Sequence, residues 1–204
     1  MVEKNQGAEQ KIKEAAREVF LAKGFDATKT RDIAEAADLN LALINYYFRS
    51  KKKLFDIIMM ETLQSFSSGV LTILNDEKTS LKDKIALFVD HYIDLLTKNQ
   101  NVAPFIINAV RDNPEEYLSK LGALEKAKSS VFIRQFQQGF INGEIPAINP
   151  IHFLLNLMGL IVFPFIAQPM ISVVSGIPKD NIFEMIQERK RLIPLWVESM
   201  LIVS

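Results

Sequence analysis

Apolar residues recur at helical spacing along almost the whole chain, and this periodicity constrains the fold more than any other feature. Near the N-terminus, five of them lie at i, i+3, i+4, i+7 and i+8, which is one face of a helix: Ile12, Ala15, Ala16, Val19 and Phe20. Short runs in which apolar and polar residues alternate, as they do in a half-buried strand, are almost absent. The sequence therefore predicts an all-α protein.

The same spacing, together with the positions of proline and glycine, places about nine helices along the chain. We expect them over residues 6–23, 31–37, 41–47, 51–74, 80–98, 102–112, 115–141, 151–174 and 180–202. Gly24 can adopt the left-handed conformation that ends the first helix. Pro164, Pro169 and Pro194 fall inside predicted helices and should kink or interrupt them, because proline lacks the backbone N–H.

Residues 30–48 have the pattern of two short helices joined by a tight turn. Thr30 and Asn40 have side chains that favour helix N-caps, and residues 38–39 supply the turn. Two short helices joined by three or four residues form a helix-turn-helix, whose second helix enters the major groove of DNA. We therefore expect a three-helix helix-turn-helix domain over residues 1–50 and a second helical domain over residues 51–204.

Charge and cysteine content limit the classes of function. Residues 1–53 carry 11 basic and 8 acidic residues, whereas residues 54–204 carry 13 and 16. This distribution permits an anionic partner at the N-terminal end. Because the chain has no cysteine, disulfides, cysteine-based metal sites and thiol catalysis are excluded. Residues 1–20 lack the apolar segment of a secretory signal, so we expect a cytoplasmic protein.

Two segments resemble the DNA-binding domain of the tetracycline-repressor (TetR) family. They cover residues 24–37 and 44–54, about a quarter of the chain. Three patterns at fixed offsets carry the resemblance: GF-x-x-T, then IA-x-x-A, then NYYF-x-SK-x-x-L. The family often has glycine where this chain has Asp38 and histidine where it has Tyr47. Aspartate tolerates the left-handed backbone better than most residues, so we expect the tight turn to survive.

The resemblance implies that DNA is contacted by the start of the second helix, by the third helix and by the start of the fourth. Ten DNA-binding residues follow from it: Thr30, Arg31, Asn40, Leu41, Ala42, Leu43, Asn45, Tyr46, Tyr47 and Lys51. Lys51 would bind a phosphate. Simpler interpretations stay open, since Tyr46 or Tyr47 could be a packing aromatic and Lys51–Lys53 could be a solvated charged run.

The middle of the chain mixes large apolar side chains with a few polar ones, which is the usual composition of a small-molecule site. The candidate ligand-pocket residues are Phe66, Phe88, His91, Tyr92, Phe105, Asn108, Arg111, Phe132, Gln135 and Phe136. The scarcity of charge among them favours a small hydrophobic effector. The same aromatic residues could equally form an ordinary core.

Residues 145–178 carry no formal charge, and residues 180–202 have more apolar surface than a single stripe. Helices that are apolar on most sides can be buried against a second subunit. In the family that the chain resembles, the last two helices usually form the dimer interface. The candidate interface residues are Leu155, Met158, Val162, Ile186, Ile193, Trp196 and Val197. A membrane span is disfavoured because polar residues and prolines interrupt the uncharged stretch.

The sequence contains no motif of an enzyme or of a cofactor or metal site. The two histidines are too far apart for a zinc-protease motif, and the glycine loop of nucleotide-binding proteins is missing. We therefore predict a non-enzymatic homodimeric repressor that binds double-stranded operator DNA and is released by a small-molecule ligand. Two alternatives stay open: a DNA-binding regulator without ligand control, and a helical membrane-associated or protein-interaction module.

Overall fold

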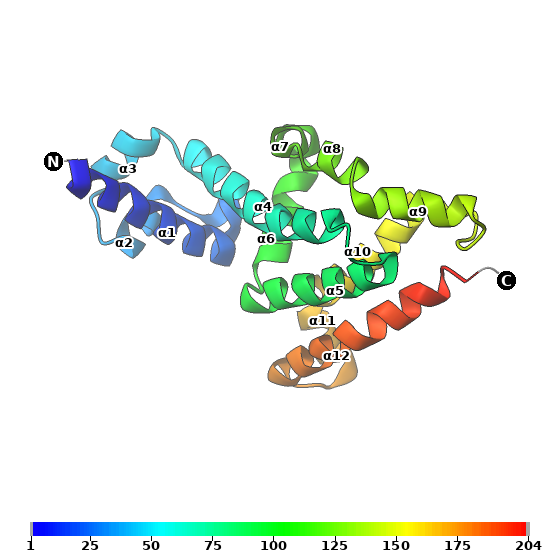
Figure 1. The fold of residues 1–204 in the computed structure, drawn as a ribbon. Helices are drawn as coiled ribbons and strands as arrows, with labels where there is room; N and C mark the ends of the chain where they lie inside the picture. Colours follow the sequence, from blue (N-terminus) through cyan, green and yellow to red (C-terminus); the bar gives the residue numbers. More distant parts are fainter. Residues whose placement is uncertain (1, 203–204) are drawn as a thin grey trace. The chain divides into compact units, whose positions relative to one another are not determined.

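The computed structural model describes residues 2–202, and every regular element among them is an α-helix (Figure 1). The predicted all-α class is confirmed. The first helices are α1 (Val2–Ala27), α2 (Thr30–Ala36), α3 (Leu41–Phe48) and α4 (Lys51–Asn75). They are followed by α5 (Leu81–Lys98), α6 (Val102–Asp112), α7 (Pro114–Leu121), α8 (Ala123–Lys128), α9 (Val131–Ile141), α10 (Pro150–Ile166), α11 (Gln168–Ser175) and α12 (Lys179–Ser199).

Residues 2–202 form twelve helices rather than about nine, because two predicted long helices are broken. The helix expected over 115–141 divides into α7, α8 and α9, where Gly122 has a φ of 57° and Ser130 caps α9. The helix expected over 151–174 divides into α10 and α11, which are bent by 75°. Pro169 lies in the first turn of α11, where its missing N–H costs little.

The other predicted breaks have different outcomes. Gly24 has a φ of 76° and interrupts α1, as expected. Pro164 and Pro194 instead stay inside α10 and α12, so neither of them ends its helix.

The chain forms two compact units, which consist of residues 1–65 with 105–117 and of residues 66–104 with 118–204. The boundaries fall inside α4, α6 and α7, so the structure does not divide the chain after residue 50 as we predicted. The first part of α4 groups with the N-terminal helices because its apolar side chains Leu54, Ile58 and Met59 are completely buried.

Aromatic rings and an ion pair hold the first unit together. Phe20 of α1 meets Phe55 of α4 edge-on, with the ring centroids 5.1 Å apart, and Phe25 meets the same ring at 4.8 Å. The Arg17 guanidinium of α1 lies 2.7 Å from the Glu61 carboxylate of α4. Because α2 and α3 both pack against α1, these contacts give the two short helices a fixed support.

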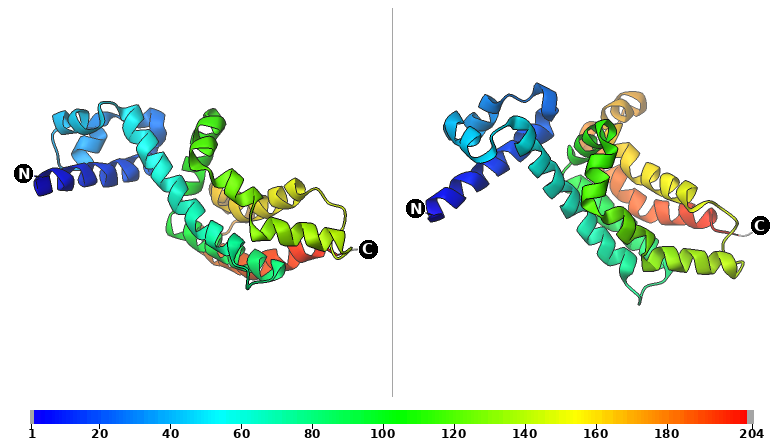
Figure 2. Two further views of the ribbon diagram at one scale, coloured as in Figure 1. Left: turned by 45° about the horizontal axis from the view of Figure 1, so that its top comes forward. Right: turned by 90° about the horizontal axis from the view of Figure 1, so that it is seen from above.

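In the second unit, α5 packs along α12, α10 lies against both of them, and α9 lies against α5 (Figures 1 and 2). Buried apolar side chains of α5 and α12 form the core: Ile85, Val89, Ile93, Leu96, Ile182, Ile186, Ile193 and Val197. Three predicted dimer-interface residues, Ile186, Ile193 and Val197, are therefore at most 1% exposed and cannot meet a second subunit. That part of the prediction is wrong because their apolar face is covered by the chain itself.

Lys84 of α5 is a charged residue that is completely buried in this unit. Its ammonium donates to the Asp76 carbonyl at 2.5 Å, the Thr79 carbonyl at 2.6 Å and the Thr79 hydroxyl at 2.9 Å. All three of its N–H donors are thus used. The side chain ties the loop between α4 and α5 to the start of α5.

Two parts of the described chain are long and apolar enough to cross a membrane: α4, and the bent pair of α10 and α11. Helix α4, however, begins with three lysines and buries Leu54, Ile58 and Met59 in the first unit. One such helix and one bent pair are weak evidence for a membrane, because core helices meet the same length and hydropathy requirement.

Candidate nucleic-acid interface

The start of α2 is capped by an acidic side chain in its own first turn. The Asp32 carboxylate accepts from the Lys29 backbone N–H at 3.0 Å and lies 3.2 Å from the Lys23 ammonium. The backbone hydrogen bond, followed by the bond to Lys23, holds the pKa of Asp32 below its ordinary value. Thr30 was predicted to be the N-cap, but Lys29 occupies that position and Thr30 is the first residue of the helix.

The turn between α2 and α3 is a Schellman motif. The Asp38 N–H donates to the Glu35 carbonyl at 3.1 Å, and the Leu39 N–H donates to the Ala34 carbonyl at 3.0 Å. Asp38 has a φ of 50°, in the left-handed region that glycine usually occupies at this position. The expectation that aspartate would preserve the tight turn is confirmed.

Replacing Asp38 by glycine should therefore stabilise the first unit. Glycine occupies the left-handed region without a steric cost, so we expect Asp38→Gly to raise the free energy of unfolding by about 0.5–1 kcal/mol. Urea denaturation followed by circular dichroism measures the change. Asp38→Ala is the matched control and should lower the same free energy, because alanine has a Cβ and lacks the polar side chain. Destabilisation by glycine would contradict the observed turn.

Helix α3 packs through one side only. Its N-cap is Asn40, as predicted, because the side-chain oxygen accepts from the Ala42 N–H at 2.9 Å. Ile44 and Phe48 are buried and anchor the helix. The predicted DNA-binding residues of this segment are exposed or half-buried: Asn40, Leu41, Ala42, Leu43, Asn45, Tyr46 and Tyr47. A short helix with a free face after a tight turn is the arrangement that reads a major groove.

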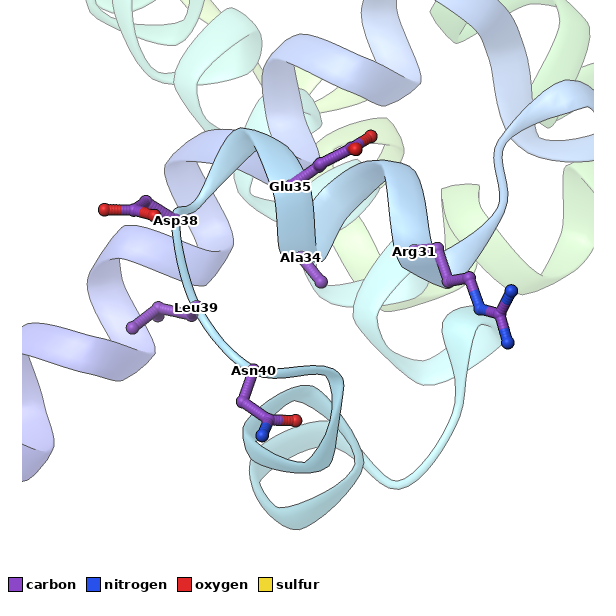
Figure 3. Close-up of a pocket in the computed structure, with 6 residues that line it drawn as sticks. All are labelled: Arg31, Ala34, Glu35, Asp38, Leu39 and Asn40. Atoms are coloured by element: carbon purple, nitrogen blue, oxygen red, sulfur yellow. The ribbon is translucent and has the colours of Figure 1, made fainter.

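A groove of about 660 Å³ lies beside the turn (Figure 3). It is lined by residues of α2 and of the segment before α3: Arg31, Ala34, Glu35, Asp38, Leu39 and Asn40. In Figure 3 the Arg31 guanidinium projects away from α2, the Glu35 carboxylate is turned away from Asn40, and the Asn40 amide lies against the first turn of α3, which it caps. Arg31 therefore presents its hydrogen-bond donors on the open side of the motif.

Cations surround the helix-turn-helix. Arg31 in α2, Arg49 after α3 and Lys53 in the first turn of α4 are exposed and form no ion pair with any described residue. Free cations of this kind are suited to phosphate oxygens. Arg49 and Lys53 were missed in the sequence analysis, although both stand in the segment that carries the family resemblance. Lys52 differs, because it is paired with Asp56.

Lys51 is held inside the first unit. Its ammonium donates to the carbonyls of Phe25 at 2.8 Å and Thr28 at 2.9 Å, and it lies 4.1 Å from the centroid of the Phe25 ring. Two of its three donors thus fix the start of α4 to the loop after α1. One donor is left, so the predicted phosphate contact of Lys51 stays a prediction.

The ten residues predicted to line a ligand pocket are divided between the units. Phe105, Asn108 and Arg111 belong to the first unit and the other seven to the second. Phe105 is buried against Phe55, with ring centroids 5.5 Å apart, whereas Asn108 and Arg111 are exposed. No single unit therefore contains the whole predicted set.

Phe66, Phe88 and Tyr92 form an aromatic cluster in the second unit, with ring centroids 6.0 Å apart for Phe66–Tyr92 and 4.7 Å apart for Phe88–Tyr92. Burial raises the pKa of Tyr92 to about 12. His91 packs against Gly69 of α4, where a Cβ would collide with its ring, and its Nε2 is buried without a described hydrogen-bond partner. These residues are packed as a core is packed.

Phe132 and Phe136 of α9 form a separate cluster with Phe153 of α10, at centroid distances of 6.3 and 5.3 Å. Gln135 lies between them in the sequence, and its amide donates to the Thr79 carbonyl at 2.9 Å. Of the predicted pocket residues, Gln135 lines a described groove of the second unit.

Comparison with known families agrees with the geometry of the helix-turn-helix. A family described as "Bacterial regulatory proteins, tetR family" matches residues 12–58, the segment from α1 to the first part of α4. The N-terminal DNA-binding segment of this chain belongs to the TetR family. The chain is a DNA-binding transcriptional regulator, and α2 and α3 are its helix-turn-helix.

Relatives of this TetR-family regulator extend the match beyond the helix-turn-helix. The probable HTH-type transcriptional regulator YttP of Bacillus subtilis (strain 168) is 26% identical over 165 residues, 80% of each chain. A putative fatty acid metabolism regulator of Clostridium perfringens has a TM-score of 0.65 at 16% identity, over 95% of this chain and 100% of that one. AibR, solved with isovaleryl coenzyme A and operator DNA, has a TM-score of 0.63 at 20% identity, over 78% and 85% of the two chains. Both of these solved structures have the same fold as this chain.

Proposed function

We propose that this regulator is a homodimeric repressor that reads operator DNA through α3 and is released by a small hydrophobic ligand. The observation that carries the proposal is the one-sided packing of α3. Its buried residues Ile44 and Phe48 hold it to the first unit, while Ala42, Asn45 and Tyr46 are exposed. A recognition helix needs both properties, since it must be held rigidly and still enter a groove.

Phosphate contacts would flank this helix. Arg31 and the Thr30 hydroxyl lie at the start of α2, and Arg49 and Lys53 follow α3 in the chain. Contacts from both sides would fix the register of α3, and the exposed side chains of α3 would then read base edges. Tyr46 is 71% exposed, and its ring meets that of the half-buried Tyr47 edge-on, with the centroids 5.2 Å apart. Tyr46 is therefore better placed than Tyr47 to contact DNA.

An exposed apolar stripe on α10 supports dimerisation. Five of its side chains are 40–63% exposed at helical spacing: Ile151, Leu154, Leu155, Phe163 and Ile166. Of the predicted interface residues, Leu155 and Trp196 are exposed and Met158 and Val162 are partly exposed. An apolar stripe of this length marks an interaction site, and a second copy would supply the second recognition helix that a palindromic operator requires.

The Leu155→Glu variant tests this interface. Two-fold symmetry would bring the new carboxylate close to its copy or to apolar residues of the other subunit. We expect the dimer dissociation constant to rise at least about 100-fold. Sedimentation velocity over a concentration series measures it. Gln137→Glu, at an exposed position of α9, adds the same charge away from the stripe and should leave the constant unchanged. An unaltered dimer for Leu155→Glu would show that α10 is not the interface.

Control by a ligand is supported by the relatives. AibR was solved with isovaleryl coenzyme A and operator DNA, and the Clostridium perfringens protein is described as a putative fatty acid metabolism regulator. In this chain, α4 starts in the first unit and ends in the second, so a ligand in the second unit could act on a continuous helix. Ligand and operator affinities would then be coupled reciprocally, typically by about 1–3 kcal/mol.

A gel shift with DNA from upstream of the regulator's own gene tests the proposal at low and physiological salt. We expect a saturable complex that one palindromic competitor removes, and its dissociation by at least one compound of a panel of acyl coenzyme A esters and lipophilic small molecules. Binding that no compound alters would favour a regulator without ligand control. A protein that ignores every duplex would contradict the proposal. We also infer a cytoplasmic location and a role without catalysis, because the relatives are described as transcriptional regulators.

A further inference from the structure

We propose that a groove at one end of the second unit binds a small amphipathic amine, that is, a protonated amino group on an apolar body. This inference rests on the proposed ligand control and gives it a site different from the aromatic residues predicted from the sequence. The groove has a volume of about 570 Å³. Small-molecule sites in proteins typically have volumes of about 300–1,000 Å³.

Four parts of the second unit form the walls of this groove: the start of α5, α9, the loop from α9 to α10, and the end of α12. Figure 2 shows the end of α12 and the α9–α10 loop at the same end of the unit. The apolar lining includes Ile85 and Ile145, which are buried, and Leu201, which is partly exposed. These side chains would cover the apolar body of a ligand.

A buried acceptor in the groove calls for a donor on the ligand. Gln135 lines the groove, and its Oε1 is buried without a hydrogen-bond partner in the described part of the chain. Its Nε2 donates to the Thr79 carbonyl at 2.9 Å, so the orientation of the amide is fixed and Oε1 is the free atom. A buried carbonyl without a partner is unfavourable, and an N–H of a ligand would give it the hydrogen bond that it lacks.

The charges that line the groove favour a cation over an anion. Lys82 and Glu198 neutralise each other, with Nζ and Oε2 3.0 Å apart. Glu144 is exposed, accepts a hydrogen bond from the Asn142 amide at 3.1 Å, and forms no ion pair with any described residue. Its carboxylate leaves the groove with an uncompensated negative charge. A protonated amine can donate to either of these acceptors, whereas a carboxylate ligand would meet like charge at Glu144 and find no donor on Gln135 Oε1.

Gly139 of α9 keeps the apolar wall in place. A Cβ at this position would lie 2.7 Å from Cδ1 of Ile145, so any larger residue would displace that side chain. A side chain at position 139 would therefore have to push aside the end of Ile145, which forms part of one wall of the groove.

The test uses the full-length regulator with isoleucine methyl groups labelled for NMR, titrated with hexylamine, 1-hexanol and hexanoate. We expect saturable shifts of the Ile85 and Ile145 methyls with hexylamine, at least about tenfold weaker binding of 1-hexanol, and no binding of hexanoate. Equal responses to the three probes, or shifts only at isoleucines outside the groove, would overturn the proposal.

Two variants separate the two acceptors. Gln135→Met removes Oε1 at similar side-chain volume and should weaken the binding of hexylamine at least about tenfold. Gln137→Met, at an exposed position of the same helix, should leave this binding unchanged. Glu144→Gln removes only the exposed charge and should weaken the binding of hexylamine about threefold or more. This variant remains informative if Gln135→Met unfolds. Unchanged affinity in Glu144→Gln would overturn the choice of a cation. Operator binding is measured separately, without hexylamine or the other probes. A regulator that does not bind operator DNA would contradict the proposed function but would leave the measured binding of hexylamine to the groove unaffected.

Discussion

The Ala42→Glu variant is expected to bind operator DNA at least about 100-fold more weakly than the natural chain. Ala42 is exposed in the first turn of α3, where the proposed DNA surface approaches. A carboxylate at this position would face the negative charge of the duplex in both subunits. The helix itself should not suffer, because an acidic side chain near a helix N-terminus is favourable by about 0.3–1 kcal/mol. Fluorescence anisotropy with a labelled operator at fixed salt measures the loss.

The matched control is Ala22→Glu, which adds the same charge at an exposed position of α1, outside α2 and α3. We expect its operator affinity to stay within about threefold of the natural chain, since exposed charges away from a contact are screened by salt. Thermal melts of both variants should match. Natural affinity in a folded Ala42→Glu variant would mean that the first turn of α3 does not face DNA.

The Lys84→Met variant should lose the most stability of the changes considered for the second unit. Methionine has a similar length and no donor, so the carbonyls of Asp76 and Thr79 and the Thr79 hydroxyl would lose their shared partner. Removing a buried partner leaves these groups unsatisfied, and we expect the free energy of unfolding to fall by about 2–4 kcal/mol. Urea denaturation followed by the fluorescence of Trp196 measures it.

Lys78→Met is the control for this change, because Lys78 lies in the same loop but is exposed. Its effect should stay within about 0.5 kcal/mol. If Lys84→Met unfolds at the same urea concentration as the natural chain, the three hydrogen bonds to the loop do not contribute to stability.

The helix-turn-helix could be predicted from the sequence because its determinants are local. The Asn40 side chain caps α3 through a residue two positions away, and Asp38 makes the turn through bonds to the helix just before it. The family resemblance covers this same segment. The predicted Thr30 cap was wrong by one residue, because Lys29 has the extended backbone of an N-cap and Asp32, from inside the helix, accepts from the Lys29 N–H.

The second unit was harder to predict because its determinants are tertiary. Helical spacing shows that Ile186, Ile193 and Val197 are apolar, but it does not say whether their own chain or a second subunit covers them. Composition likewise cannot separate a pocket from a core, and Phe66, Phe88 and Tyr92 turn out to pack on one another. The groove in the second unit is formed by residues from four separate segments. The spacing of residues along the chain does not reveal that these segments meet.

A hydroxyl-radical footprint on the bound operator tests most directly whether two copies of α3 read DNA together. We predict two protected patches on one face of the duplex, with centres about one helical turn, 10–10.5 base pairs, or a multiple of it apart. Both patches should disappear with Ala42→Glu and persist with Ala22→Glu. A single protected patch, or protection that Ala42→Glu leaves unchanged, would contradict the proposed dimeric reading of DNA by α3.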